Sequence, residues 1–423
     1  MIMDMRIYKK WFTFSIIPIV LFYLCEFRFF YLLPLPNVLF AGSTNKNLLA
    51  VFSLFVFCYF LVRTKKFTWG KFGAAFLLII ASVTLSTALS AIEFGYKLTQ
   101  VLWGIIPYLI LLLYFPAKKY LADEKIYEQF IVIGEVCTIF LTALFMLQKV
   151  KYTGASSVFL RLPDMIPEHY IWHFDEGLRV RNNFDGFFRV FAIVVGDRII
   201  AKKFKKSLLD IFAFVSILAM IALIDRSRQY LLIVLVSVFV IFIYRSKKRI
   251  TAALFLIGTF ALVGGVAVVS SKVLSIIESI LGNAGSWFAR VEGVTHYLSV
   301  GLEHFFFGIG LADAESIPEV AKYVRGVGGL YYPDDVGIVG VFALLGVVGV
   351  ILYVFVLARV FKAFKLAGNN KALILGLCVC FACSSLLSSY FDKARILALV
   401  LTAVLCDINC RQRISVYECD NID

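Results

Sequence analysis

Long apolar runs separated by short polar segments are the dominant pattern of the sequence. The runs recur along the whole chain at roughly 17 to 23 residues, the length that a helix needs to cross the hydrocarbon core of a membrane. They do not alternate between apolar and polar positions, as the strands of a membrane barrel would. The pattern therefore predicts an all-α fold, a single integral membrane domain over 1–423 built as a bundle of about twelve transmembrane helices. The predicted spans lie near 11–33, 47–63, 70–91, 98–115, 129–149, 184–200, 207–224, 229–244, 250–270, 337–358, 371–390 and 394–408.

Composition agrees with this pattern. Hydrophobic residues make up 61% of the chain and charged residues 17%, and the mean hydropathy is +0.89. A soluble domain has too little interior to bury so much apolar surface. The first apolar run carries Glu26 and Arg28 and has no convincing small-residue cleavage site. We therefore expect a retained helix there rather than a secretory signal.

Basic residues are distributed unevenly among the connections. The net charge is +14, from 42 Lys and Arg against 28 Asp and Glu. Every second connection is basic, as in "RTKKFTWGK", "AKKYLADEK", "AKKFKK" and "RSKKR". The positive-inside rule places these segments and both termini in the cytoplasm, and it accounts for the charge without a nucleic-acid partner. The opposite side then carries two long connections, 150–184 and 271–336, the second between the ninth and tenth spans.

Several absences narrow the class of protein. The cysteine cluster "CVCFAC" lies inside a predicted span without a nearby His or carboxylate, so it is expected to fill apolar space rather than bind a metal. The sequence has no evident inverted repeat, no paired Gly- or Pro-broken helices and no Gly-rich phosphate loop. These absences count against a secondary transporter and against an ATP-driven pump.

Arginines on the non-cytoplasmic side are the most informative charged residues, because the positive-inside rule does not call for them. A guanidinium presents a planar fork of donors that fits phosphate oxygens, so two or three together could hold a diphosphate at the membrane surface. These arginines can also have structural roles without function. Arg226 can pair with Asp225 and Arg189 with Asp185, and the loop arginines can be solvated. Arg228 has no acidic neighbour in sequence and is the better functional candidate. The set is Arg161, Arg179, Arg181, Arg189, Arg226, Arg228, Arg290, Arg325 and Arg395.

The connection over 271–336 contains a predicted helix between two glycine-rich turns. Residues 286–302 have an apolar stripe at helical spacing, which is typical of a helix that lies on the membrane surface or folds back into a cavity. The turns are "FFFGIGLAD" and "VRGVGGLYYPDD". The stripe consists of Trp287, Val291, Val294 and Leu298.

Polar residues of this connection are candidates for chemistry. Asp334 and Asp335 precede the tenth span, where a carboxylate can act as a general base on a sugar hydroxyl or cap the helix. His296 and His304 are eight residues apart, on roughly one helix face, and a neutral polar role is expected for them rather than metal binding. Three aromatic residues are also candidates, because they can stack on a sugar or anchor the chain at the membrane interface. They are Trp287, Tyr331 and Tyr332.

Three motifs carry a resemblance to a known family. The turn "DRSRQYLL" resembles the Ser-Arg signature of the O-antigen ligase and polymerase superfamily. Arg290, an aromatic-containing helix and then "HFFFGIGLAD" are similar to that family's P-x-G-x-G region, and Gly301 follows Arg290 at a spacing similar to a polymerase motif. "YYPDDVGIVGVFALLGVVGVILY" resembles the polymerase branch, where an acidic residue precedes G-x-x-G and a Gly-rich helix. The ligase branch usually has a His near "YYPDD", so its absence favours the polymerase branch.

The resemblance implies a glycosyltransferase of the bacterial inner membrane, with its active site facing the periplasm. It would join polyprenyl-diphosphate-linked oligosaccharide repeat units into O-antigen, capsule or exopolysaccharide, without a metal or another cofactor. Arg228 and Arg290 would stabilise the leaving diphosphate, and Asp334 or Asp335 would act on the acceptor hydroxyl. The expected partners are the lipid-linked oligosaccharide, membrane lipids, a chain-length regulator and a flippase. Substrate binding is expected from Arg181, Arg189, Arg226, Arg325, His296, His304, Trp287, Tyr331 and Tyr332.

Three other functions remain open from the sequence. A ligase would transfer the glycan to lipid A core, and an exporter or flippase would move the same lipid-linked glycan across the membrane. A scaffold of a polysaccharide assembly complex would need no catalytic arginine. A flippase would require a charged cavity that opens to both sides in turn. The topology instead places nearly all charged residues that have no oppositely charged neighbour in sequence on the outer side.

Overall fold

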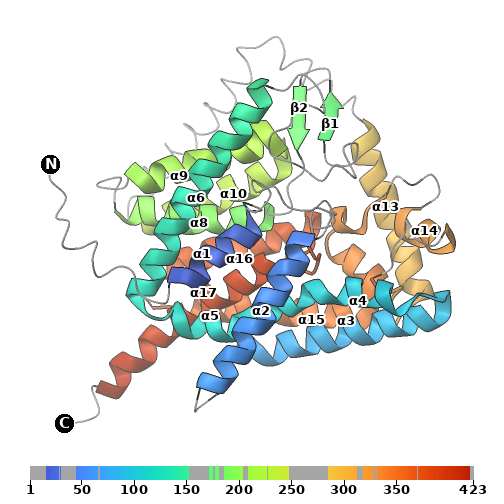
Figure 1. The fold of residues 1–423 in the computed structure, drawn as a ribbon, viewed down its shortest axis with the longest axis horizontal. Helices are drawn as coiled ribbons and strands as arrows, with labels where there is room; N and C mark the ends of the chain where they lie inside the picture. The colour runs from blue at the N-terminus through green and yellow to red at the C-terminus, as the bar shows by residue number, and fades with distance from the viewer. Residues whose placement is uncertain are drawn as a thin grey trace. The chain divides into compact units, whose positions relative to one another are not determined.

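The computed structural model describes residues 16–27, 29, 44–64, 67–151, 171–174, 177–180, 185–202, 208–225, 227–246, 284–311, 318–326, 329, 331–368 and 370–419. Its elements in chain order are α1 (Ile16–Glu26), α2 (Thr44–Arg63), α3 (Gly73–Phe94), α4 (Leu98–Ile105), the 3-10 helix η4 (Ile106–Leu113), α5 (Tyr114–Tyr120), α6 (Glu124–Lys151), β1 (Ile171–Phe174), β2 (Gly177–Val180), α8 (Asp185–Ala201), α9 (Leu208–Ala219), the π-helix η6 (Met220–Asp225), α10 (Arg228–Arg245), α13 (Ala284–Glu303), α14 (Pro318–Arg325), the 3-10 helix η7 (Pro333–Asp335), α15 (Ile338–Leu366), α16 (Lys371–Leu387) and α17 (Ile396–Cys419) (Figure 1).

The described residues form apolar helices of a membrane protein, as the hydropathy pattern predicts. Each predicted span that falls in the described part coincides with a helix. Within that part, six helices are long and apolar enough to cross a membrane: Lys46–Arg63, Gly73–Phe94, Leu98–Tyr120, Glu124–Val150, Leu208–Asp225 and Ile338–Leu366. Shorter apolar helices are Ile17–Glu26, Gln229–Arg245, Lys371–Leu387 and Ile396–Cys410. The ninth predicted span, 250–270, lies outside the described residues, so the count of about twelve stays a prediction.

Contacts divide the chain into two compact units. The first unit contains 1–70, 106–231 and 393–411, and the second contains 71–105, 232–392 and 412–423. The single domain over 1–423 stays a prediction.

In the first unit, α6 packs against α1, α8 and α9. The side chains of Thr142 and Lys149 on α6 donate to the main-chain oxygens of Ser216 and Leu223 on the helix α9–η6. Both bonds join residues 74 positions apart, so these two helices run in the same direction. Helix α8 runs the other way. Gly134 of α6 makes this packing possible, because a Cβ there would lie 2.8 Å from the ring of Phe191 on α8 and would collide with Tyr23 on α1.

A short β-hairpin belongs to the same unit and was not predicted from the sequence. Strands β1 and β2 pair antiparallel, with Ile171 opposite Val180 and Phe174 opposite Gly177. The hairpin falls within the connection 150–184, which was expected to be a loop. The remainder of the described fold is helical.

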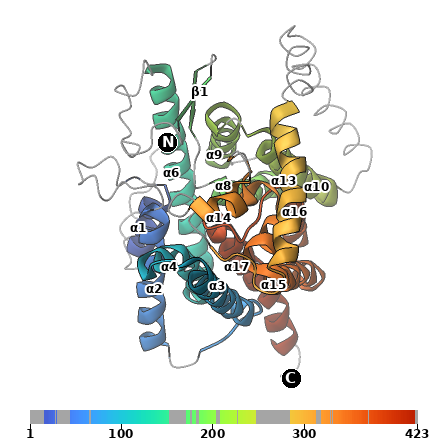
Figure 2. The same ribbon diagram turned by 90° about the vertical axis from the view of Figure 1, so that its right-hand side faces the viewer.

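In the second unit, α13 packs on α15, and α15 runs alongside α3. Helix α13 rises steeply from the α3–α15 pair (Figures 1 and 2). Gly301 allows the close approach, because a Cβ there would collide with the ring of Phe342 on α15. The predicted helix over 286–302 is confirmed, but Val291 and Leu298 of the predicted stripe are exposed and the buried face carries Tyr297. The core is formed by Tyr297, Val300, Ile309, Val320, Val324, Val336 and Ala343.

Helix α15 is broken at Gly346, which has φ 64° and ψ −163°. The glycine-rich turn after α13 satisfies the main-chain groups that the break exposes. Ile309 N and Gly310 N donate to Ala343 O and Leu344 O at 2.9 Å, while Val347 N and Val348 N donate to Phe305 O and Phe306 O at 2.8 and 3.4 Å. We call these four bonds the main-chain seam. It explains how a broken helix can lie in an apolar span, where every backbone polar group needs a partner.

Candidate functional site

Two buried arginines of the first unit converge on one tyrosine. The guanidinium carbons of Arg189 and Arg395 lie 4.4 and 5.7 Å from the ring centroid of Tyr230. Nη2 of Arg395 also donates a hydrogen bond to the Tyr230 hydroxyl at 2.7 Å. Arg189 is 0% exposed, and both Arg395 and Tyr230 are 7% exposed. We call these three residues the arginine–tyrosine cluster.

The cluster is built from the starts of three helices. Arg189 is in the second turn of α8, Tyr230 is the third residue of α10, and Arg395 directly precedes α17. Gly186 brings α8 close to α17, because a Cβ there would lie 3.2 Å from the Cα of Arg395. The first N–H groups of a helix lack intrahelical partners and carry the positive end of its dipole. The position thus adds positive potential to two guanidiniums.

The arginine singled out from the sequence, Arg228, is the first residue of α10, two residues before Tyr230. Its side chain lies outside the described residues. The segment before it is a turn: the π-helix η6 ends at Asp225, and Ser227 N donates to Ile221 O at 3.1 Å. The Ser-Arg turn of the sequence is therefore adjacent in the chain to the cluster.

This arrangement suits a phosphate or diphosphate. Guanidiniums and helix N-termini are the two groups that proteins most often use to bind phosphate oxygens. Charges buried this deeply interact strongly with an anion, because little water screens them.

The acidic pair belongs to the second unit. Asp334 and Asp335 lie in η7, and neither caps the following helix: the N-cap of α15 is Gly337, which makes no side-chain cap. The capping alternative for α15 is therefore wrong. Both carboxylates are half-buried and lie near Tyr297. Burial raises the pKa of the Tyr297 hydroxyl, and the nearby charge of Asp334 raises it further.

Arg325 and the two neighbouring tyrosines occur in the same unit. The guanidinium carbon of Arg325 lies 4.1 Å from the ring centroid of Tyr332. Tyr331 donates through its hydroxyl to Glu292 Oε2 at 3.0 Å, and this bond to a carboxylate raises its pKa. The described contacts therefore pair Arg325 with the ring of Tyr332 and Glu292 with the hydroxyl of Tyr331, in the residues that directly precede η7.

The histidines hold α13 to its neighbours. His296 Nε2 is 3.0 Å from Tyr323 O, and its ring lies 5.4 Å from the ring of Tyr331. His304 Nδ1 is 3.7 Å from Glu93 Oε1 of α3. Searched over the described part, the chain shows no group of three or more His, Cys, Asp or Glu placed to hold a metal ion.

The remaining predicted site residues are only partly placed. Arg290 is half-buried on α13, eleven positions before Gly301, and that glycine is explained by its packing against Phe342. Arg181 and Arg226 lie outside the described residues, as does the side chain of Trp287.

Sequence reasoning missed Tyr230 and did not give Arg395 a role in the site. Tyr230 stands in the quoted "DRSRQYLL", and Arg395 was among the outer-side arginines, but the two lie 165 residues apart. No local spacing relates them. The signal that was present is the positive charge at the start of three apolar helices, where the positive-inside rule does not explain it.

A small apolar cavity in the first unit does not compete as a substrate site. It holds about 10 Å³, which is room for one water, and Leu121, Phe130 and Val404 are among its lining residues.

Comparison with known proteins finds no family model that matches the chain and no curated protein that matches it. The O-antigen superfamily therefore stays a resemblance.

Proposed function

We propose that this protein is a membrane glycosyltransferase that polymerises polyprenyl-diphosphate-linked oligosaccharide repeat units into a surface polysaccharide. The observation that supports the proposal is the convergence of Arg189 and Arg395 on Tyr230 at the start of α10. Arg228 is the first residue of that helix. The proposal places the diphosphate of the lipid-linked donor at this cluster, on the periplasmic side of a bacterial inner membrane.

The arginines would act on the leaving group. When the sugar anomeric carbon is attacked, negative charge develops on the departing diphosphate, and positioned donors stabilise that charge. Each charge-assisted hydrogen bond contributes about 1.5–3 kcal/mol, and about 1.4 kcal/mol changes a rate tenfold. Asp334 or Asp335 would take the proton from the acceptor hydroxyl. That role is a separate proposal with its own test, substitution of each aspartate by asparagine.

A chain-length assay tests the proposal. The full chain is expressed in a strain that lacks its own copy, and the surface polysaccharide is resolved by size. We expect Arg228→Ala and Arg228→Lys to leave mostly single repeats, because a point charge does not replace the guanidinium fork. The control is Arg359→Lys, because Arg359 lies on α15 outside the cluster, with its guanidinium carbon 4.8 Å from the ring centroid of Phe355. Normal chain length in Arg228→Lys would remove the diphosphate role from that residue.

The same strain separates the alternatives. Loss of the gene leaves single-repeat surface glycan if the protein is a polymerase, and it removes all surface glycan if the protein is a ligase. An exporter or flippase would instead leave lipid-linked repeats on the cytoplasmic leaflet. A scaffold would tolerate Arg228→Ala.

A further inference from the structure

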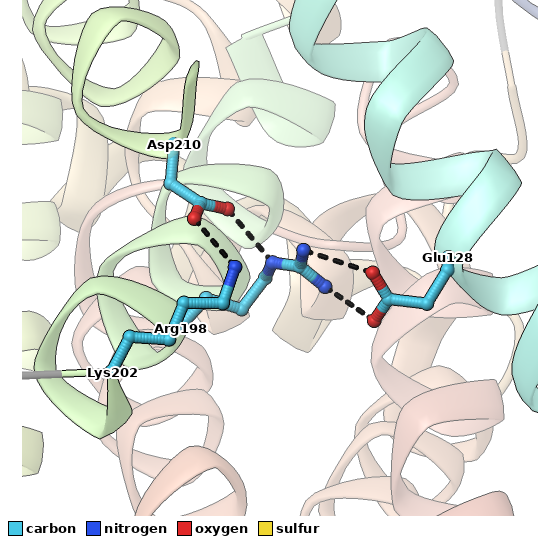
Figure 3. A network of polar contacts seen from close by, with 4 residues as sticks. All are labelled: Glu128, Arg198, Lys202 and Asp210. Atoms are coloured by element: carbon cyan, nitrogen blue, oxygen red, sulfur yellow. Dashed lines mark hydrogen bonds and ion pairs between the residues drawn. The ribbon is translucent and has the colours of Figure 1, made fainter. Parts of the chain in front are cut away.

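The helices α6, α8 and α9 of the first unit are joined by an ion-pair network. Arg198 Nη1 and Nη2 donate to Glu128 at 2.6 and 3.0 Å, and its Nε donates to Asp210 Oδ1 at 2.8 Å. Lys202 Nζ donates to Asp210 Oδ2 at 2.8 Å (Figure 3). These four residues, which we call the Arg198 network, contain two cations and two carboxylates. Their charges are therefore balanced without any further group.

Glu135 is a third carboxyl beside this network. It is 1% exposed and lies on α6 about 16 Å along the helix axis from Glu124. Its Oε1 atom is buried and has no hydrogen-bond partner among the described residues. The register that joins Thr142 to Ser216 and Lys149 to Leu223 sets Glu135 of α6 opposite position 209 of α9, next to Asp210. The two carboxyl groups share a hydrogen bond there.

A hydrogen bond between two carboxyl groups requires one proton, because a carboxylate only accepts. Both oxygens of Asp210 already accept N–H bonds from cations, so Asp210 is the ionised partner. The O–H of Glu135 must then be the donor. If Glu135 also lost its proton, three carboxylates would face two cations inside an apolar helix bundle, which is strongly unfavourable.

We infer that Glu135 is a proton-binding site buried in the first unit, a neutral carboxylic acid that donates to Asp210. The ligand is a proton, and the site is independent of the proposed transferase chemistry. Among the described residues, the titratable or charged groups beside it are Tyr23, Arg198, Lys202 and Asp210.

Glu26 shows what a buried carboxylate looks like when it is ionised. It is also 1% exposed, but Lys46 Nζ donates to both of its oxygens at 2.8 Å. Glu26 therefore has a cation of its own, whereas no ion pair joins Glu135 to a cation in the part of the chain that the structure describes. Release of the Glu135 proton would place two carboxylates side by side, and their repulsion would weaken the packing of α6 on α9. Protonation of Glu135 is therefore linked to the packing of these two helices.

Infrared spectroscopy of the purified full-length protein in H₂O and D₂O tests the inference. A protonated carboxylic acid has a C=O stretch separate from the carboxylate bands, and this stretch shifts in D₂O. We expect the wild-type spectrum at neutral pH to contain such a band and the Glu135→Gln spectrum to lack it. The amide of the glutamine can still donate to Asp210, so this variant retains the contact and should unfold at a similar temperature.

Two further variants make the test specific. Glu26→Gln is the control, and its spectrum should keep the whole band. Asp210→Asn should lose the band although Glu135 is present, because Arg198 and Lys202 then have one carboxylate fewer and Glu135 ionises to replace it. An identical band in wild type and Glu135→Gln, or one that persists in Asp210→Asn, would overturn the inference. No substrate is present, so failure of the transferase proposal does not affect the result.

Discussion

Two arginines nine residues apart on α8 have contrasting surroundings. Arg198 is bonded to carboxylates of α6 and α9, so its charge is neutralised by the helices that it joins. Arg189 faces the ring of Tyr230, which the guanidinium of Arg395 also reaches. The residue type and the helix are the same, and the neighbouring elements make the difference. The first arrangement ties three helices together through carboxylates, whereas the second brings two guanidiniums to one aromatic ring at the starts of three helices.

Removing Arg198 should have the largest effect. Arg198→Ala leaves Glu128 without its partner and the buried Asp210 with Lys202 alone, and breaking a buried ion pair in this way costs about 3–5 kcal/mol. We expect a large loss of folded protein and a lower unfolding temperature in detergent. An unfolding temperature equal to that of the wild type would refute the structural role.

Arg189→Lys should affect activity rather than folding. An ammonium group keeps the interaction with the Tyr230 ring but loses the fork, so under the proposed function one or two charge-assisted bonds to the diphosphate would be lost. At about 1.5–3 kcal/mol for each bond, we expect transfer from a lipid-linked donor to be at least about tenfold slower, with an unchanged unfolding temperature. The opposite outcome, normal transfer with reduced stability, would show that both arginines of α8 are structural.

Tyr230→Phe tests the centre of the cluster. The ring that Arg189 contacts remains, while Arg395 loses the hydroxyl to which it donates at 2.7 Å. Arg395 keeps its charge and loses only this positioning contact, so we expect transition-state stabilisation to fall by about 1 kcal/mol, which is roughly fivefold slower transfer in the same assay. Activity as low as that of Arg189→Lys would indicate that the hydroxyl itself contacts the substrate.

Lys202→Ala should have the smallest effect. The Lys202 side chain is 41% exposed, and Asp210 keeps its bond to Arg198. Exposed ion pairs contribute at most about 1 kcal/mol, so we expect a shift in the unfolding temperature much smaller than that of Arg198→Ala. A shift of equal size would mean that the two cations of the network are equivalent.

The helical framework could be predicted from the sequence because its signal is local. A membrane helix satisfies its own backbone and needs only a sufficiently long apolar segment, so hydropathy alone located the long apolar helices of the described part. The short helix α14 lacks that signal and was not predicted. The helix α13 and the turn after it were also predicted, from an apolar stripe and from the glycines at 308 and 310.

The candidate site could be predicted only in part, because its geometry depends on contacts between distant segments. Arginines at unexpected positions were recognised, yet the meeting of Arg189 with Arg395 depends on the packing of α8 against α17. Gly346 illustrates the same limit: "ALLGVVGV" is typical of a continuous helix, and the break is possible only because residues 305–310 supply main-chain partners. Glu135 was overlooked because a single acid in an apolar run does not indicate where its proton goes.

The main-chain seam has a consequence for how this protein can change over evolutionary time. All four of its bonds join backbone atoms, so substitutions at most flanking positions leave them intact. A Cβ at Gly308 would collide with the backbone of Leu344, and one at Gly346 with the backbone of Phe306. Gly310 has a positive φ as well, and a Cβ there would collide with Ser90. Descendants of this chain can therefore change most residues around the crossing and keep it, provided that these three glycines are inherited.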